Sequence, residues 1–170
     1  MKRFALLLIG SLYFLPAKAQ EFPKGFSMPI ELGQGFNKPS EVSPLYLLTL
    51  QAVPQVTIIP GRLKLGAVLG GFYPASHVGA LAGPRLTLKL MEGPSVLTAS
   101  SFNVHLLGEY LWATAPSPLN SRQLIGGGIG VGSSDLVTLA FKLHREVNQP
   151  ATWFQFSISY NPFKRSITPL

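Results

Sequence analysis

The stretch SFNVHLLGEYLW, residues 101–112, indicates the fold because its side chains alternate in character along the chain. Successive side chains of a β-strand point to opposite faces, so the stretch predicts a strand with two unlike faces. One face is uncharged and ends in two aromatic residues: Phe102, Val104, Leu106, Gly108, Tyr110 and Trp112. The other face carries an amide, an imidazole and a carboxylate: Asn103, His105, Leu107, Glu109 and Leu111. The uncharged face is buried in a soluble sheet, whereas in an outer-membrane barrel it faces lipid and the polar face lines the lumen.

The same alternation recurs along the chain, whereas no segment after residue 19 shows a capped helical period. We therefore expect an all-β protein with eight strands, at residues 26–36, 44–59, 62–72, 79–91, 101–112, 123–132, 135–145 and 152–161. Pro54 lacks the N–H group that a ladder hydrogen bond needs, so a bulge or a break is expected there.

The joints between these strands alternate in length. Short joints with turn-forming residues are expected at 60–61, 92–95 and 133–134. Longer joints rich in Pro, Ser and Asn are expected at 37–43, 73–78, 113–122 and 146–151. Short turns on the inner side, longer loops outside and an even number of strands are typical of bacterial outer-membrane barrels.

Except at the strand ends, ionisable residues inside the predicted strands keep to the polar parity. They are Glu31, Lys64, Arg85, Lys89, His105, Glu109, Lys142 and His144. A Lys or Arg that faces lipid at mid-bilayer costs about 2–4 kcal/mol, which explains such a pattern. An eight-stranded barrel is just wide enough for its own side chains, and an unpaired buried charge is costly. These residues and Asn103 are therefore expected to form a polar network in the lumen, in which Glu109 contacts one of the basic residues.

Aromatic residues cluster at the predicted strand ends. Those expected to form a girdle at the membrane surfaces are Phe36, Tyr46, Phe72, Tyr110, Trp112, Trp153 and Tyr160. An apolar ring with a polar tip suits the level of the lipid headgroups.

The N-terminus has the pattern of a secretion signal. Lys2 and Arg3 precede an apolar segment at 4–15, and Ala17-Lys18-Ala19 fits a cleavage site. The apolar segment is shorter than the roughly 20 residues that a transmembrane helix needs. We expect a signal peptide at 1–19 and one domain at 20–170, with the barrel at about 26–161 and a short C-terminal tail. The net charge is +7, but no dense basic run predicts nucleic-acid binding.

No catalytic or metal site is expected, and no cofactor. The chain has no cysteine and only three histidines. His105 and Glu109 share a strand face but lie about 13 Å apart at a rise of ~3.3 Å per residue, so they cannot share a metal ion. The glycine run at 126–132 lacks the spacing of a phosphate loop and is expected to make room for long inward side chains.

The eight alternating segments, the signal peptide and the alternating joints resemble the small eight-stranded outer-membrane barrel proteins of the OmpA-transmembrane-domain and OmpX type. The resemblance covers nearly all of the mature chain but rests on architecture, without a diagnostic motif. It implies an antiparallel up-and-down transmembrane β-barrel in the outer membrane of a Gram-negative-type bacterium. It also implies contact with outer-membrane lipid, insertion by the barrel assembly machinery and a monomeric state. The tail ending in Thr168-Pro169-Leu170 departs from the aromatic C-terminal residue of many such barrels.

Some barrels of this size modify lipid A, and the deacylase type has a His-x-Ser pattern with a downstream Glu. His77, His105 and His144 lack this pattern, so no enzymatic activity is expected. We expect a structural, adhesive or narrow-conduit role. The alternative is a soluble exported lipocalin-like barrel that binds a small apolar ligand. A soluble surface would be short of charge, because only 12% of the residues are charged against a usual quarter.

Overall fold

The computed structural model describes residues 25–39, 45–74, 78–94, 101–114, 121–133 and 136–162. All regular secondary structure in these residues is β-strand. The described residues contain no helix long and apolar enough to cross a membrane. The signal peptide predicted at 1–19 and the tail residues 163–170 lie outside the described residues.

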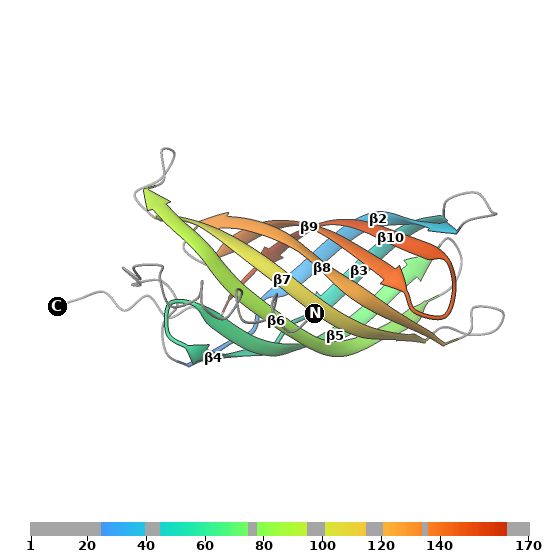
Figure 1. The fold of residues 1–170 in the computed structure, drawn as a ribbon, viewed down its shortest axis with the longest axis horizontal. Coiled ribbons are helices and arrows are strands. Elements are labelled where there is room, and N and C mark those ends of the chain that lie inside the picture. Colours follow the sequence, from blue (N-terminus) through green and yellow to red (C-terminus); the bar gives the residue numbers. More distant parts are fainter. Residues whose placement is uncertain are drawn as a thin grey trace, which may run out of the picture.

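The strands form a closed antiparallel barrel with eight positions around the ring (Figure 1). We call each position a stave; a stave is either one strand or two short strands that follow each other in line. The strands are β1 (Phe26–Ser27), β2 (Ile30–Pro39), β3 (Leu45–Ala52), β4 (Gln55–Ile59), β5 (Leu63–Pro74), β6 (Gly79–Pro94), β7 (Ser101–Thr114), β8 (Arg122–Ser133), β9 (Val137–Glu146) and β10 (Ala151–Tyr160). The first stave is β1 followed by β2, and the second is β3 followed by β4. Each stave pairs with its neighbours in sequence, and β10 pairs with β2 to close the ring. The predicted eight-stranded up-and-down barrel is confirmed as a fold.

Two staves are interrupted at facing positions. The break at Val53 and Pro54 separates β3 from β4, as Pro54 predicts. A second break at Met28 and Pro29, which the sequence analysis missed, separates β1 from β2. The Val53 amide donates a hydrogen bond of 2.9 Å to the Pro29 carbonyl, so the two breaks are joined to each other.

One predicted turn is wrong. Residues 92–94 belong to β6, which is 16 residues long, and Glu92 lies opposite Asn103 in the register of β6 with β7. The joint is therefore residues 95–100, which lie outside the described residues. The β5–β6 register ends at Leu88, so the last part of β6 lacks a β5 partner, and Pro94 is tolerated on such an edge. The turn predicted at Pro60-Gly61 is confirmed, and Gly61 has a φ of 75°.

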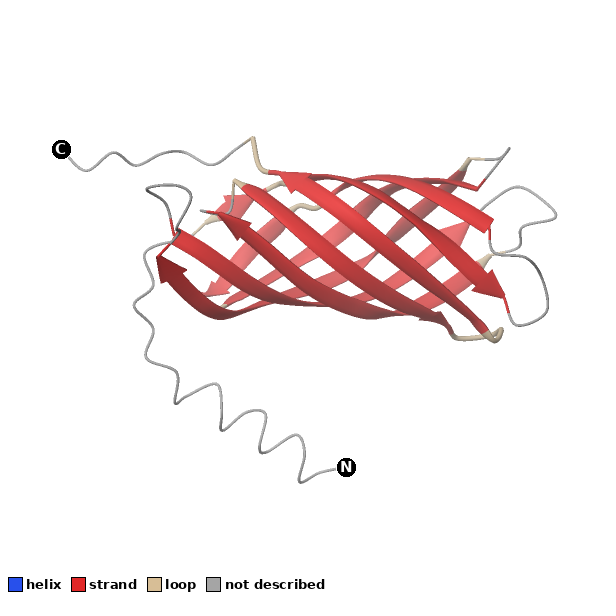
Figure 2. Cartoon of the chain, turned by 90° about the horizontal axis from the view of Figure 1, so that it is seen from above, coloured by secondary structure: helices blue, strands red, loops and turns tan. Residues whose placement is uncertain are grey.

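The two ends of the barrel differ. We call the end where β2 begins and β10 ends the proximal end, and the opposite end the distal end (Figure 2). Along each strand, inward side chains alternate with outward ones. The inward set contains the buried charged residues, whereas the outward set is apolar over most of its length. The strand of residues 101–112 follows this rule, with Asn103, His105 and Glu109 inside.

Gly128 provides a test of how closely β8 approaches its neighbours. A Cβ atom at Gly128 would lie 1.9 Å from the Phe141 carbonyl oxygen of β9, closer than any real contact. Relief of this overlap requires a backbone shift, so Gly128→Ala is expected to lower the free energy of unfolding by about 1–3 kcal/mol. Urea unfolding of the folded protein measures this loss.

Gly108 is the matched control, because a Cβ atom there meets nothing within 4 Å. Gly108→Ala is expected to leave the stability unchanged or to raise it by about 0.4–1 kcal/mol, since alanine restricts the unfolded chain. Equal stability of the two variants would contradict the close packing of β8 against β9.

Candidate functional site in the barrel interior

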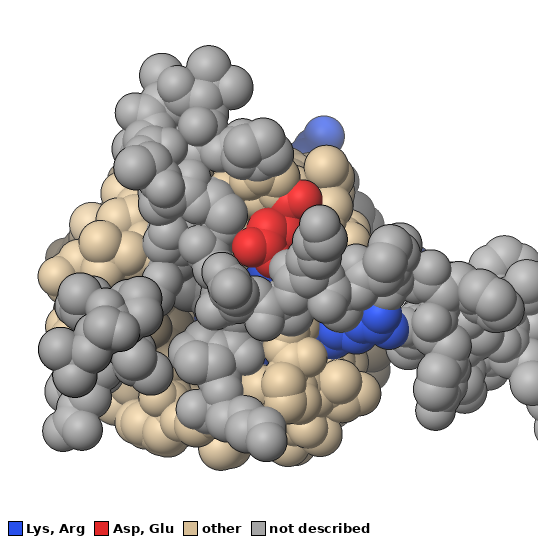
Figure 3. Space-filling view, turned by 90° about the vertical axis from the view of Figure 1, so that its left-hand side faces the viewer, with Lys and Arg blue, Asp and Glu red and all other residues tan. Residues whose placement is uncertain are grey.

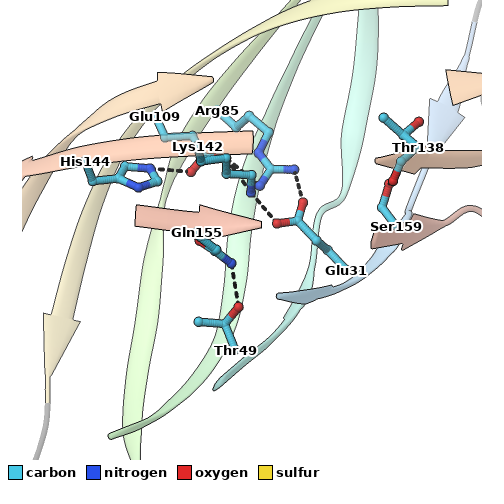
Figure 4. Close-up of polar contacts among 9 residues, drawn as sticks. All are labelled: Glu31, Thr49, Arg85, Glu109, Thr138, Lys142, His144, Gln155 and Ser159. Carbon is cyan, nitrogen blue, oxygen red and sulfur yellow. Dashed lines mark hydrogen bonds and ion pairs between the residues drawn. The ribbon is translucent and has the colours of Figure 1, made fainter. Parts of the chain in front are cut away.

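An ion-paired network fills the middle of the barrel (Figure 4). Arg85 donates from Nη1 to Glu31 Oε2 at 2.9 Å, and its Nη2 lies 2.5 Å from Glu109 Oε1. Lys142 Nζ lies 3.2 Å from Glu109 Oε1 and also donates to Glu31. His144 Nε2 lies 2.8 Å from Glu109 Oε2. The prediction that Glu109 pairs with a basic residue is confirmed.

The charges of this central network balance. Glu31 and Glu109 oppose Arg85 and Lys142, and all four side chains are buried. An imidazole with its proton on Nε2 donates to Glu109 whether or not the ring is charged, so His144 adds a hydrogen bond in either state. Buried ions remain in place only when they are paired and hydrogen-bonded in this way.

The strand register explains why these side chains meet. Arg85 and Glu109 are direct cross-strand partners on β6 and β7. Glu109 and His144 are both cross-strand neighbours of Gly126 on β8, and Lys142 is the cross-strand neighbour of Gly128. The missing side chains on β8 leave room for the long ones beside them, as expected from the glycine run. Glu31 comes from β2, so its contacts with Arg85 and Lys142 connect β2 to β6 and β9 through the interior.

An apolar cluster fills the interior at the distal end, where the sequence analysis predicted none. Its distal members are Leu47, Phe72, Leu81, Leu111, Ala113, Leu124 and Trp153. The rings of Phe72 and Trp153 meet edge to face, with their centroids 5.4 Å apart. The prediction that Phe72 and Trp153 belong to an outer girdle is therefore wrong, because each is only 5% exposed. Strand parity could have found this, since Phe72 has the parity of Lys64 and Trp153 that of Gln155.

The other predicted girdle residues point outward. Phe36, Tyr46, Trp112 and Tyr160 are exposed, and Tyr110 is half-buried. Trp112 packs edge to face against the Tyr110 ring at 5.1 Å. The Tyr110 hydroxyl donates to Gln123 at 2.8 Å.

The remaining predicted network residues lie nearer the proximal end. Lys89 pairs with Glu92 instead of the central network. Lys64 and His105 line a polar cavity of about 50 Å³, and Asn103 is fully buried. Glu31, Gln55 and Thr87 also line this cavity.

Three further polar contacts were missed from the sequence. Glu92 and Glu146 were assigned to joints, yet Glu92 pairs with Lys89 and Glu146 with Arg122, the latter at 3.2 Å. Gln155 donates to the Thr49 hydroxyl at 2.5 Å across the interior. Strand parity alone marks Thr49 and Gln155 as inward, but the sequence does not show which inward residues meet.

No group of His, Cys, Asp and Glu suited to a metal ion occurs among the described residues. In comparisons with protein-family models, with curated proteins and with solved structures, no match to the chain was found.

Proposed function

We propose that the protein is a small outer-membrane β-barrel of the OmpA/OmpX type. Its role is structural: the barrel is a membrane anchor that holds its distal loops at the cell surface. The observation that carries this proposal is that apolar side chains cover the outside and charged side chains lie inside, the reverse of a soluble protein. Large apolar residues such as Leu50, Leu69, Ile129 and Phe141 are more than half exposed on the outer face. The ion pairs lie inside, which is the arrangement that a lipid surrounding favours.

The strand lengths agree with this proposal. A transmembrane strand needs about 9–11 residues when it is tilted. Strands β2, β9 and β10 have 10 residues each, and β5 to β8 have 12 to 16. The soluble lipocalin-like alternative needs a water-compatible outer face and an apolar ligand cavity. The exposed leucines and the polar lining of the interior cavity weigh against it.

Within this proposal, the filled interior favours an anchor over the narrow conduit. The apolar cluster occupies the distal part and the central network crosses the middle. Because buried side chains occupy both levels of the interior, we infer a barrel that conducts no ions at rest. Regular conductance steps of the native protein in a planar bilayer would contradict this part of the proposal.

Membrane fractionation with gel heat-modifiability tests the proposal. The native protein is expected in the membrane fraction, with a mobility shift between unheated and boiled samples. Phe141→Arg, in the middle of the outer face of β9, is expected to lose about 2–4 kcal/mol of stability in lipid and much of its folded band.

Thr114→Arg is the control, because it adds the same charge on the outer side at the distal end of β7. Its expected loss is about 0–1 kcal/mol, as for a charge near the membrane surface. A native protein that stays in the aqueous fraction, or Phe141→Arg tolerated as well as Thr114→Arg, would refute a lipid-facing outer surface.

A further inference from the structure

Lys38 and Arg145 are the two exposed Lys or Arg residues in the part of the chain that the structure describes. Lys38 lies near the distal end of β2 and Arg145 near the distal end of β9, and both point outward. The strand register places each of them opposite Thr152 of β10, which has the outward parity of its strand. The three side chains therefore form one polar row across the outer rim of the barrel, which we call the distal rim row.

The distal rim row carries an unbalanced positive charge. Neither Lys38 nor Arg145 forms an ion pair with a described residue, whereas Arg122 at the same end pairs with Glu146 at 3.2 Å. The proximal end differs, because acidic as well as basic side chains are visible there (Figure 3). The unbalanced charge favours an anionic partner at the distal rim row.

An apolar strip leads from the distal rim row toward the middle of the outer face. Next to the row, the rings of Phe36 and Phe154 stack with their centroids 5.1 Å apart. Beyond these rings the outer face is hollowed over a volume of about 230 Å³, lined by Leu32, Gly33, Gln34, Leu48, Phe156 and Ile158. The side chains that line this hollow are apolar except that of Gln34, so the hollow suits hydrocarbon better than water.

The strip has the length of one membrane leaflet. Lys38 and Leu32 are six residues apart on β2, which is about 20 Å along the strand at ~3.3 Å per residue. At the tilt of about 40° that is typical of such barrels, this is about 15 Å of depth, half of a hydrocarbon core of roughly 30 Å. A lipid with its headgroup at the distal rim row therefore places an acyl chain over the stacked rings and in the hollow.

We propose that the distal rim row and the hollow bind one anionic lipid with a phosphate headgroup. Arg145 and Lys38 donate to the phosphate oxygens, and the Thr152 hydroxyl lies between them as a third donor. One acyl chain follows Phe36 and Phe154 into the hollow. This inference rests on the membrane proposal and adds to it a lipid that is held at one place on the barrel.

Native mass spectrometry of the folded protein in a non-ionic detergent tests the site. The probes are phosphatidylglycerol, which is anionic, and phosphatidylcholine with the same acyl chains, which has no net charge. We expect one phosphatidylglycerol to bind about tenfold more tightly than phosphatidylcholine. Equal binding of the two lipids would overturn the proposal. Equally tight binding of glycerol phosphate, which lacks acyl chains, would also overturn it, because the site would then hold a phosphate and not a lipid.

Variants of the distal rim row locate the binding. Lys38→Gln and Arg145→Gln each remove one charge and keep a polar side chain. Each is expected to weaken phosphatidylglycerol binding about fivefold, and the double variant about 25-fold. Arg62→Gln is the matched control, because it removes one positive charge at the proximal turn, and its affinity is expected to stay within about twofold of the native value. If the double variant bound phosphatidylglycerol as tightly as Arg62→Gln, the assignment to the distal rim row would be wrong.

Failure of this inference can be told apart from failure of the membrane proposal. Heat-modifiability in vesicles of phosphatidylcholine alone reports whether the native protein and each variant fold in a membrane without any anionic lipid. A native protein that folds in these vesicles but binds no phosphatidylglycerol would overturn the lipid site and leave the membrane barrel in place. A native protein that stays in the aqueous fraction would overturn both.

Discussion

Replacement of Glu109 by glutamine is expected to lower the free energy of unfolding by about 3–5 kcal/mol, the range for breaking a buried ion pair. Glu109 contacts Arg85, Lys142 and His144 at once, and its side chain is fully buried. Its loss leaves two buried cations with one carboxylate, Glu31, in the central network. Urea unfolding in detergent micelles or lipid measures the change.

A second substitution separates charge imbalance from lost packing. Lys142→Met removes one cation and keeps a long unbranched side chain, so Glu31 and Arg85 remain as a balanced pair. The double variant Glu109→Gln with Lys142→Met is therefore expected to be more stable than Glu109→Gln alone, with a coupling energy of about 1–3 kcal/mol. Additive losses, or a loss below 1 kcal/mol for Glu109→Gln, would show that the network contributes little.

The eight staves could be predicted from the sequence because side-chain parity is a local property. Residues 101–112 alternate so regularly that their inward and outward faces follow from the period of two alone. The break at Pro54 was predicted for the same reason, since the missing N–H belongs to that residue. The break at Pro29 was missed, although Pro29 lacks the same N–H group; it lies opposite the first break, where the Val53 amide donates to the Pro29 carbonyl.

The sequence largely predicted which residues belong to the interior site, but not which of them contact each other. Parity places Glu31, Arg85, Glu109 and Lys142 inside, whereas contacts across the lumen depend on the closed register of all staves. Glu92 was missed because Gly93-Pro94 indicates a turn when the neighbouring strand is unknown. In the structure these residues continue β6 beyond its pairing with β5, and Glu92 forms an ion pair with Lys89.

The apolar cluster shows where a general rule misled the sequence analysis. Aromatic residues near strand ends were assigned to the outer surface, although parity places Phe72 and Trp153 inside. The two readings conflicted at these positions, and the local rule of parity was the correct one. The interior is therefore layered, with an apolar distal part, a charged middle and a polar proximal cavity.

Trp153→Ala is expected to lower the free energy of unfolding by about 3–5 kcal/mol, as for other large aromatic residues removed from a packed interior. Trp153 is 5% exposed and contacts Phe72 within the apolar cluster, so its removal leaves a cavity that the surrounding staves cannot fill. Closed staves held by ladder hydrogen bonds on both sides relax little around such a gap. The change is measured by urea unfolding.

Phe156→Ala on the same strand distinguishes this cause from the general loss of an aromatic ring. Phe156 lies three residues further along β10 but points outward, with 47% of its surface exposed, so its removal opens no internal cavity. Its expected cost is about 1.5–3 kcal/mol, because a large apolar side chain leaves its lipid contact but no cavity is left behind. Because the two residues share one strand and differ in the direction of their side chains, a larger loss for Phe156→Ala than for Trp153→Ala would reverse the assignment of the inner and outer faces. A larger loss for Trp153→Ala would instead show that the distal interior is a packed apolar core, which no lumen lined only by polar residues would possess.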